Sequence, residues 1–268
     1  MSFQAARLVP IVLALSTLPG VVCPLAAGEP TPAAVTTFNN YIAALESRLA
    51  QQHSAKSTFL VLPGADERLR NGELIIDKLT PADTVTFSGA MLHHWRGTVF
   101  VPGATTADFH RLMQDFTAYP RIYAPQVVQA KVLSPDDGGH MQTMLRVRQK
   151  HVLTVVMDTT YDVTFGDLDP QHRYSLSRST NIAEIADADT PGEHPLGPAE
   201  NHGFLWRLNT YWSSEERDGG LYMQIESVSL TRSIPAGFAW AIGPFVESVP
   251  RESLEFTLRS TASALRKP

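Results

Sequence analysis

Glu226 is the residue of this 268-residue chain that comes closest to a catalytic acid or base. It alternates with Gln224 and Val228 in the strand-like run 221–232. If its carboxyl group faced an apolar interior, it could act as the general base that a cyclase or dehydratase needs. The simpler interpretation is a structural salt bridge with an arginine of a neighbouring strand. Candidate arginines in or beside strand-like runs are Arg146, Arg148 and Arg232.

Motifs of nucleophilic, phosphate-binding and zinc-dependent enzymes do not occur in the sequence. It contains no G-x-S-x-G, H-E-x-x-H, P-loop or dinucleotide fingerprint. The best metal-like pair is His93 and His94, but adjacent residues of a strand point to opposite faces and do not readily share one ion. A closed zinc site needs about three or four converging ligands. We therefore expect neither a metal nor a cofactor.

The composition is that of a globular protein with a substantial core, because 43% of the residues are hydrophobic and 18% are charged. The net charge is −5 and the pI is near 6.0, and the lysines and arginines are scattered along the chain. Proteins that bind nucleic acid usually carry a clustered basic surface. Nucleic acid is therefore not an expected partner.

Residues 1–27 are typical of an export signal. Arg7 precedes the apolar run 8–18, which is too short for a membrane span, and small residues up to Ala27 offer a cleavage site. The only cysteine is Cys23, and a lipoprotein signal would have a small residue before it, where Val22 stands. Lipidation at Cys23 is thus the weaker alternative to a periplasmic or secreted protein. After cleavage the chain would contain no cysteine, which excludes thiol catalysis and disulfides.

The rest of the chain divides into three parts. Residues 28–36, rich in proline and alanine, predict a linker, and residues 37–90 an N-terminal extension with its own small elements. A helix is expected over 37–52 and a short strand over 74–76. The main domain is expected to span 91–268. The predicted face of the 37–52 helix consists of Phe38, Tyr41, Ile42, Leu45 and Leu49.

The main domain reads as one strand, two short helices and then a series of antiparallel strands. Residues 91–101 form the first strand, and Thr105 or Thr106 caps the first helix. Turn residues at 136–139, 166–170 and 215–220 separate later strands. The expected strands are 127–134, 141–149, 152–165, 173–179, 181–185, 203–213 and 221–232.

The chain ends in a predicted amphipathic helix over 250–267. Pro250 suits a first helical turn, and Leu254, Leu258, Ala262 and Leu265 fall on one stripe. A long amphipathic helix after a run of strands needs a surface to lie on. The sequence therefore predicts an α+β fold in which a curved antiparallel sheet covers this helix.

Two phrases in this order resemble the START-like superfamily, also called SRPBCC. Residues 108–120, with an acid, aromatic residues and Tyr119-Pro120, look like that family's first helix and its exit. Residues 225–235 with the helix start at 250–258 look like its closing strand and helix. The resemblance covers about 94–267 and implies a helix-grip fold. Together with the export signal, it indicates an exported bacterial member of this superfamily. It implies no single activity, because the family contains lipid carriers, sterol binders, cyclases and hydrolases.

Strand alternation predicts which side chains face the interior of such a fold. The inward faces of the expected strands and of the C-terminal helix are mostly apolar, and the small residues 260–264 of the helix leave room for a ligand or allow close packing. The expected ligand-binding residues are Leu145, Val155, Met157, Tyr161, Trp206, Leu208, Trp212, Met223, Ile225, Phe238, Trp240, Leu254, Leu258 and Ala262.

The apolar segment 236–246 contains aromatic residues between glycines. Four apolar residues could gate a cavity or dip into a membrane surface: Phe238, Trp240, Ile242 and Phe245. The alternative is a buried start of the C-terminal helix.

Two functions of different classes follow. The first is non-catalytic binding or transport of a lipid or another hydrophobic small molecule outside the cytoplasm. The second is a cyclase, aromatase or dehydratase that acts on a polyketide-like substrate through Glu226, Tyr161 and Arg146. The export signal favours the first, because such enzymes mostly act on cytoplasmic thioesters. A filled cavity would leave a third role, as an interaction module that uses the 37–90 extension.

Overall fold

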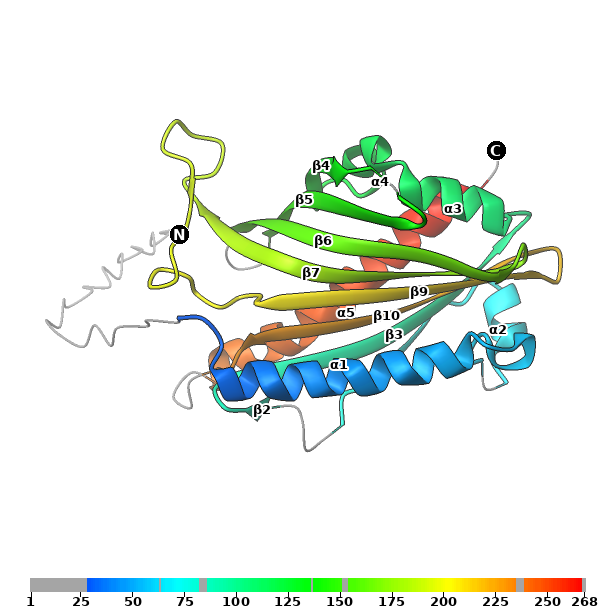
Figure 1. Ribbon diagram of the computed structural model, residues 1–268, viewed down its shortest axis with the longest axis horizontal. Helices are drawn as coiled ribbons and strands as arrows, with labels where there is room; N and C mark the ends of the chain where they lie inside the picture. Colours follow the sequence, from blue (N-terminus) through cyan, green and yellow to red (C-terminus); the bar gives the residue numbers. More distant parts are fainter. Residues whose placement is uncertain are drawn as a thin grey trace, which may run out of the picture.

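The computed structural model describes residues 28–62, 64–81, 86–135, 137–150, 154–234 and 239–266, with the backbone but not the side chains of 239–247. Among these residues a ten-stranded antiparallel sheet has the spatial order β1-β3-β10-β9-β7-β6-β5-β4, with β2 beside β3 and β8 beside β7 (Figure 1). The strands are β1 (Ile75–Lys78), β2 (Thr86–Phe87), β3 (Ala90–Pro102), β4 (Val127–Ser134), β5 (His140–Lys150), β6 (Thr154–Asp169), β7 (His172–Ala186), β8 (His194–Pro195), β9 (Arg207–Arg217) and β10 (Gly220–Arg232).

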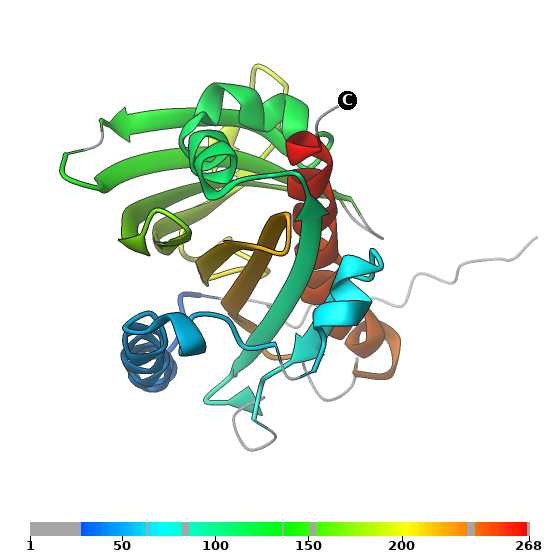
Figure 2. The ribbon, with the colours of Figure 1, turned by 90° about the vertical axis from the view of Figure 1, so that its right-hand side faces the viewer.

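Helices lie on both faces of this sheet. The helices are α1 (Pro32–Gln52), η1 (Lys56–Thr58), α2 (Asp66–Arg70), α3 (Thr106–Gln114), η3 (Phe116–Ala118), α4 (Tyr119–Ile122) and α5 (Ala239–Leu265). The sheet curls around α5, and α1 lies against its opposite, convex face (Figure 2). The predicted helix-grip fold is therefore confirmed. No helix in the described part of the chain is long and apolar enough to cross a membrane.

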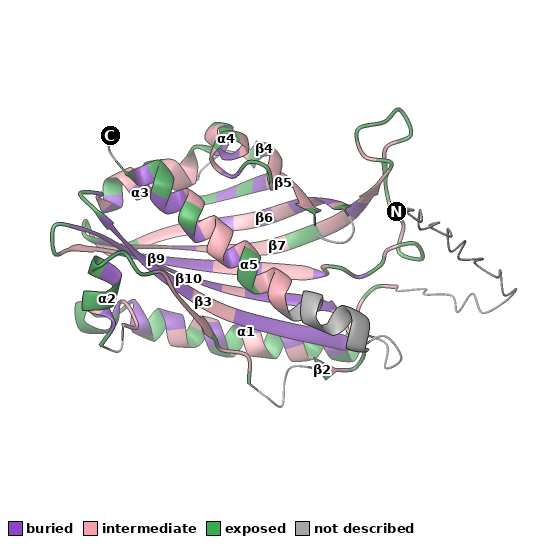
Figure 3. Cartoon of the chain, turned by 180° about the vertical axis from the view of Figure 1, so that it is seen from behind, coloured by how far each residue is buried: buried purple, intermediate pink, exposed green. Residues whose placement is uncertain are grey.

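The C-terminal half of α5 packs tightly on the middle of the concave face. Leu254, Leu258 and Ala262 are buried there against β3 and β10. Gly97 of β3 makes this approach possible, because a Cβ atom at that position would lie 2.2 Å from Cδ1 of Leu258. Figure 3 shows α5 running obliquely across the sheet.

The predicted start of the C-terminal helix is wrong. Helix α5 begins at Ala239 and continues through Pro250, where the sequence suggested a first turn. A proline inside a helix removes one backbone hydrogen bond and bends the axis, but it does not have to end the helix. The backbone of 239–246 is thus helical, as one interpretation of the apolar segment held, while its side chains lie outside the described residues.

The N-terminal extension joins the same sheet. Helix α1 begins at Pro32 rather than at residue 37, because Thr31 caps it by accepting a hydrogen bond from the backbone N–H of Ala34 at 3.1 Å. Its apolar face, with Phe38 and Ile42, is buried on β3, β9 and β10. Strand β1 pairs with the edge of β3. The limits of the domains themselves stay a prediction.

Several strand boundaries differ from those expected. Strand β9, for example, continues to Arg217 into the predicted turn at 215–220. Strand β6 runs to Asp169 through the predicted turn at 166–170, and β7 is one strand with a bulge at Thr180 where two strands were expected. Strand β9 begins at Arg207, although the expected strand began at residue 203. Bulges and strand starts depend on the neighbouring strand, which local pattern does not reveal. Because β9 begins at Arg207, Trp206 lies just before the strand.

Candidate functional site

Strand β10 presents alternate residues to two different environments. Met223 and Ile225 point to the concave side and pack with α5. Glu226 and Val228 point to the convex side, where α1 covers them. This alternation divides the candidate functional residues into two sets, which have different chemistry.

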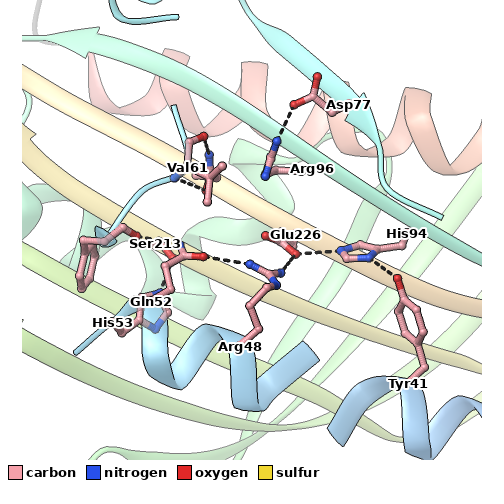
Figure 4. A network of polar contacts seen from close by, with 12 residues as sticks. Tyr41, Arg48, Gln52, His53, Val61, Asp77, His94, Arg96, Ser213 and Glu226 are labelled. Atoms are coloured by element: carbon pink, nitrogen blue, oxygen red, sulfur yellow. Dashed lines mark hydrogen bonds and ion pairs between the residues drawn. The ribbon is translucent and has the colours of Figure 1, made fainter. Parts of the chain in front are cut away.

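The convex set centres on Glu226, which is 2% exposed. Its Oε2 accepts a hydrogen bond from Arg48 of α1 and lies 2.8 Å from Nε2 of His94 on β3. The other ring nitrogen of His94, Nδ1, lies 2.7 Å from the hydroxyl oxygen of Tyr41, also on α1. Figure 4 shows this chain of contacts between the helix and the sheet.

The charges in this network favour an ionised Glu226. Burial opposes ionisation, but the hydrogen bond from His94 and the charge of Arg48 outweigh it and hold the pKa of Glu226 below its usual value. Burial and the neighbouring carboxylate raise the pKa of Tyr41. Oε1 of Glu226 is buried and has no hydrogen-bond partner among the described residues. The carboxylate is therefore held in an ion pair under α1.

Further polar contacts hold the same helix to the sheet. Glu46 receives two hydrogen bonds from Arg178 of β7, at 2.6 and 2.9 Å, and one from the hydroxyl of Tyr211 at 3.0 Å. At the end of α1, Nε2 of His53 lies 2.7 Å from Oγ of Ser213. Burial, and next the charge of Arg48, lower the pKa of His53 to about 4, so this ring is neutral at neutral pH.

The structure does not bring the alternative catalytic set together. Tyr161 lies on the concave side in an aromatic cluster with Tyr119 and Tyr123, whereas Glu226 lies on the convex side. Arg146 forms hydrogen bonds with Asp158 at 2.7 and 2.9 Å and with Glu193 at 2.7 Å. The suggested partners of Glu226 on neighbouring strands are also wrong, because the arginine that reaches it, Arg48, belongs to α1.

One half of the concave face is closed, because α5 packs there on β3, β9 and β10. Six of the expected ligand-binding residues are 0–4% exposed in one continuous core with Val99 and Val101. Because these side chains fill the space under α5, the small residue Ala262 serves close packing. A hollow of about 10 Å³ remains at the end near α3, beside Phe109 and Arg173. The six residues are Trp212, Met223, Ile225, Leu254, Leu258 and Ala262.

The other half of the concave face, formed by β5, β6, β7 and the start of β9, is less tightly covered. Leu145, Val155 and Leu208 face inward there but are only half-buried. Met157 and Tyr161 are buried at 5% and 6% exposure. Burial raises the pKa of Tyr161 to about 12, so its hydroxyl stays protonated at neutral pH.

Three of the expected ligand-binding residues are not found on the described concave face. Trp206 was expected to face inward, but it packs against the α1 side of the sheet with Val228 and Leu230. Because β9 starts only at Arg207, strand alternation does not extend to position 206. Phe238 and the side chain of Trp240 lie outside the described residues.

Sequence reasoning missed Glu184, which is 2% exposed near the end of β7. Its carboxylate accepts hydrogen bonds from the backbone N–H groups of His202 and Phe204, both at 3.1 Å, and lies 2.8 Å from Nδ1 of His202. The residue anchors the segment that leads into β9. The sequence does contain a sign of this residue, because Glu184 is a single acidic residue between the apolar Ala183 and Ile185.

The two adjacent histidines point to opposite faces, as expected. His94 belongs to the convex network, while Nε2 of His93 lies 3.4 Å from Oγ1 of Thr231. Within the described residues, no group of three or more His, Cys, Asp or Glu side chains is placed to hold a metal ion.

Comparison with known proteins gives distant structural likenesses. No protein-family model and no curated protein sequence matches the chain. A STAR-related lipid transfer protein from Xanthomonas axonopodis is 18% identical, with 72% of this chain and 99% of that chain covered and a TM-score of 0.46. The Zhui aromatase/cyclase from a Streptomyces species is 14% identical, with 64% and 92% covered and a TM-score of 0.42.

The helix-grip architecture of this chain is START-like. At such identities and TM-scores the solved structures carry no argument about activity.

Proposed function

We propose that this protein binds a lipid or another hydrophobic small molecule between the concave face of its sheet and α5, without transforming it. The observation that carries the proposal is the partial exposure of Leu145, Val155 and Leu208 on the inward face of the sheet. When an apolar ligand covers apolar side chains that line an interior and still contact solvent, the free energy of the system falls.

The titratable groups support binding rather than catalysis. Glu226, the strongest candidate base, is paired with Arg48 and His94 on the opposite face of the sheet. Tyr161 faces the interior, but its raised pKa makes it a poor proton donor or acceptor near neutral pH. A general base must lie within hydrogen-bond reach of the proton that it removes, and Glu226 does not face the interior.

The proposal includes a location. We infer that residues 1–27 direct export, from Arg7, the apolar run 8–18 and the small residues before residue 28. Binding would then take place in the periplasm or outside the cell. The apolar segment 236–246 is the proposed point of transient contact with a membrane surface from which a hydrophobic ligand is taken up.

Native mass spectrometry of the intact protein, purified without detergent, tests the binding function. The expected result is an extra mass that organic solvent extracts, or uptake of lipid on incubation. Leu145→Trp should fill the less covered half of the interior and lower uptake at least about tenfold, because an indole ring occupies the volume of a ligand segment.

The matched control is Gln142→Trp, which adds the same ring to an exposed position of the same strand. Circular dichroism and thermal unfolding establish that both variants are folded. If neither the wild type nor the control takes up lipid, the proposal is wrong. It is also wrong if folded Leu145→Trp protein takes up as much lipid as the wild type.

A further inference from the structure

A row of polar side chains crosses the middle of the concave face. In register, Ser177 of β7 lies opposite Thr210 of β9, and Thr210 lies opposite Ser227 of β10. Ser227 in turn lies opposite Trp95 of β3. Residues in register point to the same side of a sheet, so these side chains form a continuous strip on the side of α5. Ser229, two residues along β10, extends the strip.

The hydroxyl groups of this strip have no hydrogen-bond partners among the described residues. Those of Ser177, Thr210, Ser227 and Ser229 form no hydrogen bond with any residue that the structure describes, although Ser229 is only 6% exposed. The indole N–H of Trp95 is shielded from solvent and is also unpaired within the described part of the chain.

Other inward-facing hydroxyls nearby do have partners. Oγ of Ser179 accepts a hydrogen bond from the backbone N–H of Leu208 at 2.9 Å, and the hydroxyl of Thr159 donates one to the carbonyl oxygen of Leu145 at 3.0 Å. Buried polar groups in proteins are nearly always paired, and an unpaired one costs free energy. Ser177, Thr210 and Ser227 are partly buried, so water can satisfy their hydroxyls in the ligand-free protein, and a ligand that displaces this water must offer hydrogen bonds in its place.

The charged side chains around the strip limit the chemical class of the ligand that can bind it. Side chains beside it on the inward face, such as Leu208, Trp212 and Ile225, are uncharged. The titratable His93 is in register with Ser229 at the end of the strip, with its Nε2 3.4 Å from Oγ1 of Thr231. Arg173 lies toward the closed end, beside the small hollow near α3. Lys78 lies at the exposed edge of the sheet, with its ammonium nitrogen 5.9 Å from the centre of the Trp95 ring. Ser177, Thr210 and Ser227 have only uncharged residues in register with them, so a charged group placed there would lose its hydration without an adjacent ionic partner.

We propose that the ligand is an uncharged amphipathic molecule whose hydroxyl or carbonyl group binds the strip formed by Ser177, Thr210 and Ser227. Its apolar part covers Leu145, Val155 and Leu208. This inference rests on the proposed binding function and adds the chemical class of the ligand. Serine and threonine hydroxyls both donate and accept hydrogen bonds, so the strip can satisfy an alcohol, a ketone or an ester.

Five probes with the same twelve-carbon chain test the inference: dodecane, 1-dodecanol, 2-dodecanone, dodecanoate and dodecylammonium. Each is delivered to the intact protein from a cyclodextrin carrier, and binding is followed by calorimetry, with every affinity referred to the probe's transfer from water to alkane. The alcohol and the ketone should bind at least about tenfold tighter than dodecane and than either ion, since one or two good hydrogen bonds contribute about that factor.

Removal of the hydroxyls should erase this preference and leave apolar binding intact. In the triple variant Ser177→Ala, Thr210→Val, Ser227→Ala, the alcohol and the ketone should bind within about twofold of dodecane, while dodecane binds as it does to the wild type and neither ion binds more tightly than before. The single variant Thr210→Val should show a smaller loss of the same kind. The matched control is Thr180→Val at the exposed bulge of β7, which should leave the preference unchanged.

The outcomes separate the two proposals. Equal affinities for all probes in the wild type, or strongest binding of dodecanoate or dodecylammonium, would overturn the assigned ligand class while the binding function stands. A preference that survives in the triple variant would overturn the role of the strip. If no probe binds, dodecane included, the binding function fails and this inference fails with it.

Discussion

The two faces of β10 use polar side chains in opposite ways. Glu226 points to α1 and is paired with Arg48 and His94. Ser227, the next residue, points to α5 and has no partner among the described residues. On the convex face, polar groups hold a helix in place. On the concave face, the unpaired groups lie where the proposed ligand binds.

This difference follows from what each helix covers. Helix α1 places Arg48, Glu46 and Tyr41 directly against polar residues of the sheet, so most buried polar groups there are paired. Exceptions on this face include Oε1 of Glu226 and Nε1 of Trp206, which have no partner among the described residues. Helix α5 packs through apolar residues such as Leu254 and Leu258, and none of its described side chains forms a hydrogen bond with the hydroxyl strip. Paired polar groups specify how elements fit together, whereas unpaired ones cost stability and are retained where function needs them.

The largest expected effect comes from breaking the convex network. Glu226→Ala should lower the free energy of unfolding by about 3–4 kcal/mol, because it leaves His94 and Arg48 without their carboxylate. The lower end applies because the Arg48 side chain is 42% exposed and can turn to water. Urea unfolding measures the change. Glu255→Ala, which removes a half-exposed partner of Arg251 and Arg259 on α5, should cost less than about 1 kcal/mol, and equal losses would contradict the comparison.

The second largest expected effect is a pH dependence of the free energy of unfolding, which arises on the convex face. The pKa of His53 is lowered from 6.5 to about 4 in the folded protein, so the unfolded chain binds a proton more readily in that interval. The stability that neutral His53 contributes is present above pH 6.5 and is lost as the pH falls toward 4, by an amount on the order of 2–3 kcal/mol. Glu226, with a pKa lowered from 4.5, adds a loss in the same direction at more acidic pH.

Denaturant unfolding between pH 7.5 and pH 4 measures this slope. His53→Gln keeps a hydrogen-bonding group near Ser213 and removes the titration, so its stability should change much less over the same interval. An identical slope in wild type and variant would assign the dependence to another group.

A single hydroxyl on the convex face should have a moderate effect. Tyr211 is 2% exposed, donates to Glu46 and accepts from Nδ2 of Asn209 at 3.2 Å. Tyr211→Phe should therefore cost about 1 kcal/mol in thermal or urea unfolding. Tyr174→Phe on β7 is the matched control, because no hydrogen bond to its hydroxyl is found among the described residues, and it should change stability by less than about 0.5 kcal/mol. A Tyr211→Phe effect no larger than the control would remove the hydroxyl from the network.

The smallest effect is expected on the concave face without ligand. Ser177→Ala and Ser227→Ala remove hydroxyls that have no partner among the described residues, so each should change the free energy of unfolding by no more than about 0.5 kcal/mol in either direction. Urea unfolding of the ligand-free protein measures this change. A loss above about 1 kcal/mol would show that these hydroxyls support the fold and would weaken the contrast between the faces.

Local pattern was sufficient for most elements and for most inward faces. Alternation in β5 and β6 correctly placed Leu145, Val155 and Tyr161 on the concave side. It failed for Trp206, because the start of a strand depends on its neighbours, and for the start of α5, because a proline can lie inside a helix.

The sequence by itself determined the order of strands and helices, the inward faces and the separation of His93 from His94, because these follow from periodicity along one chain segment. Only the tertiary structure decided which polar groups are paired. Arg48 lies 178 positions from Glu226 in the chain, and the strip of Ser177, Thr210 and Ser227 exists only through the register of three strands. Pairing and its absence are properties of distances in space, and no local pattern encodes them.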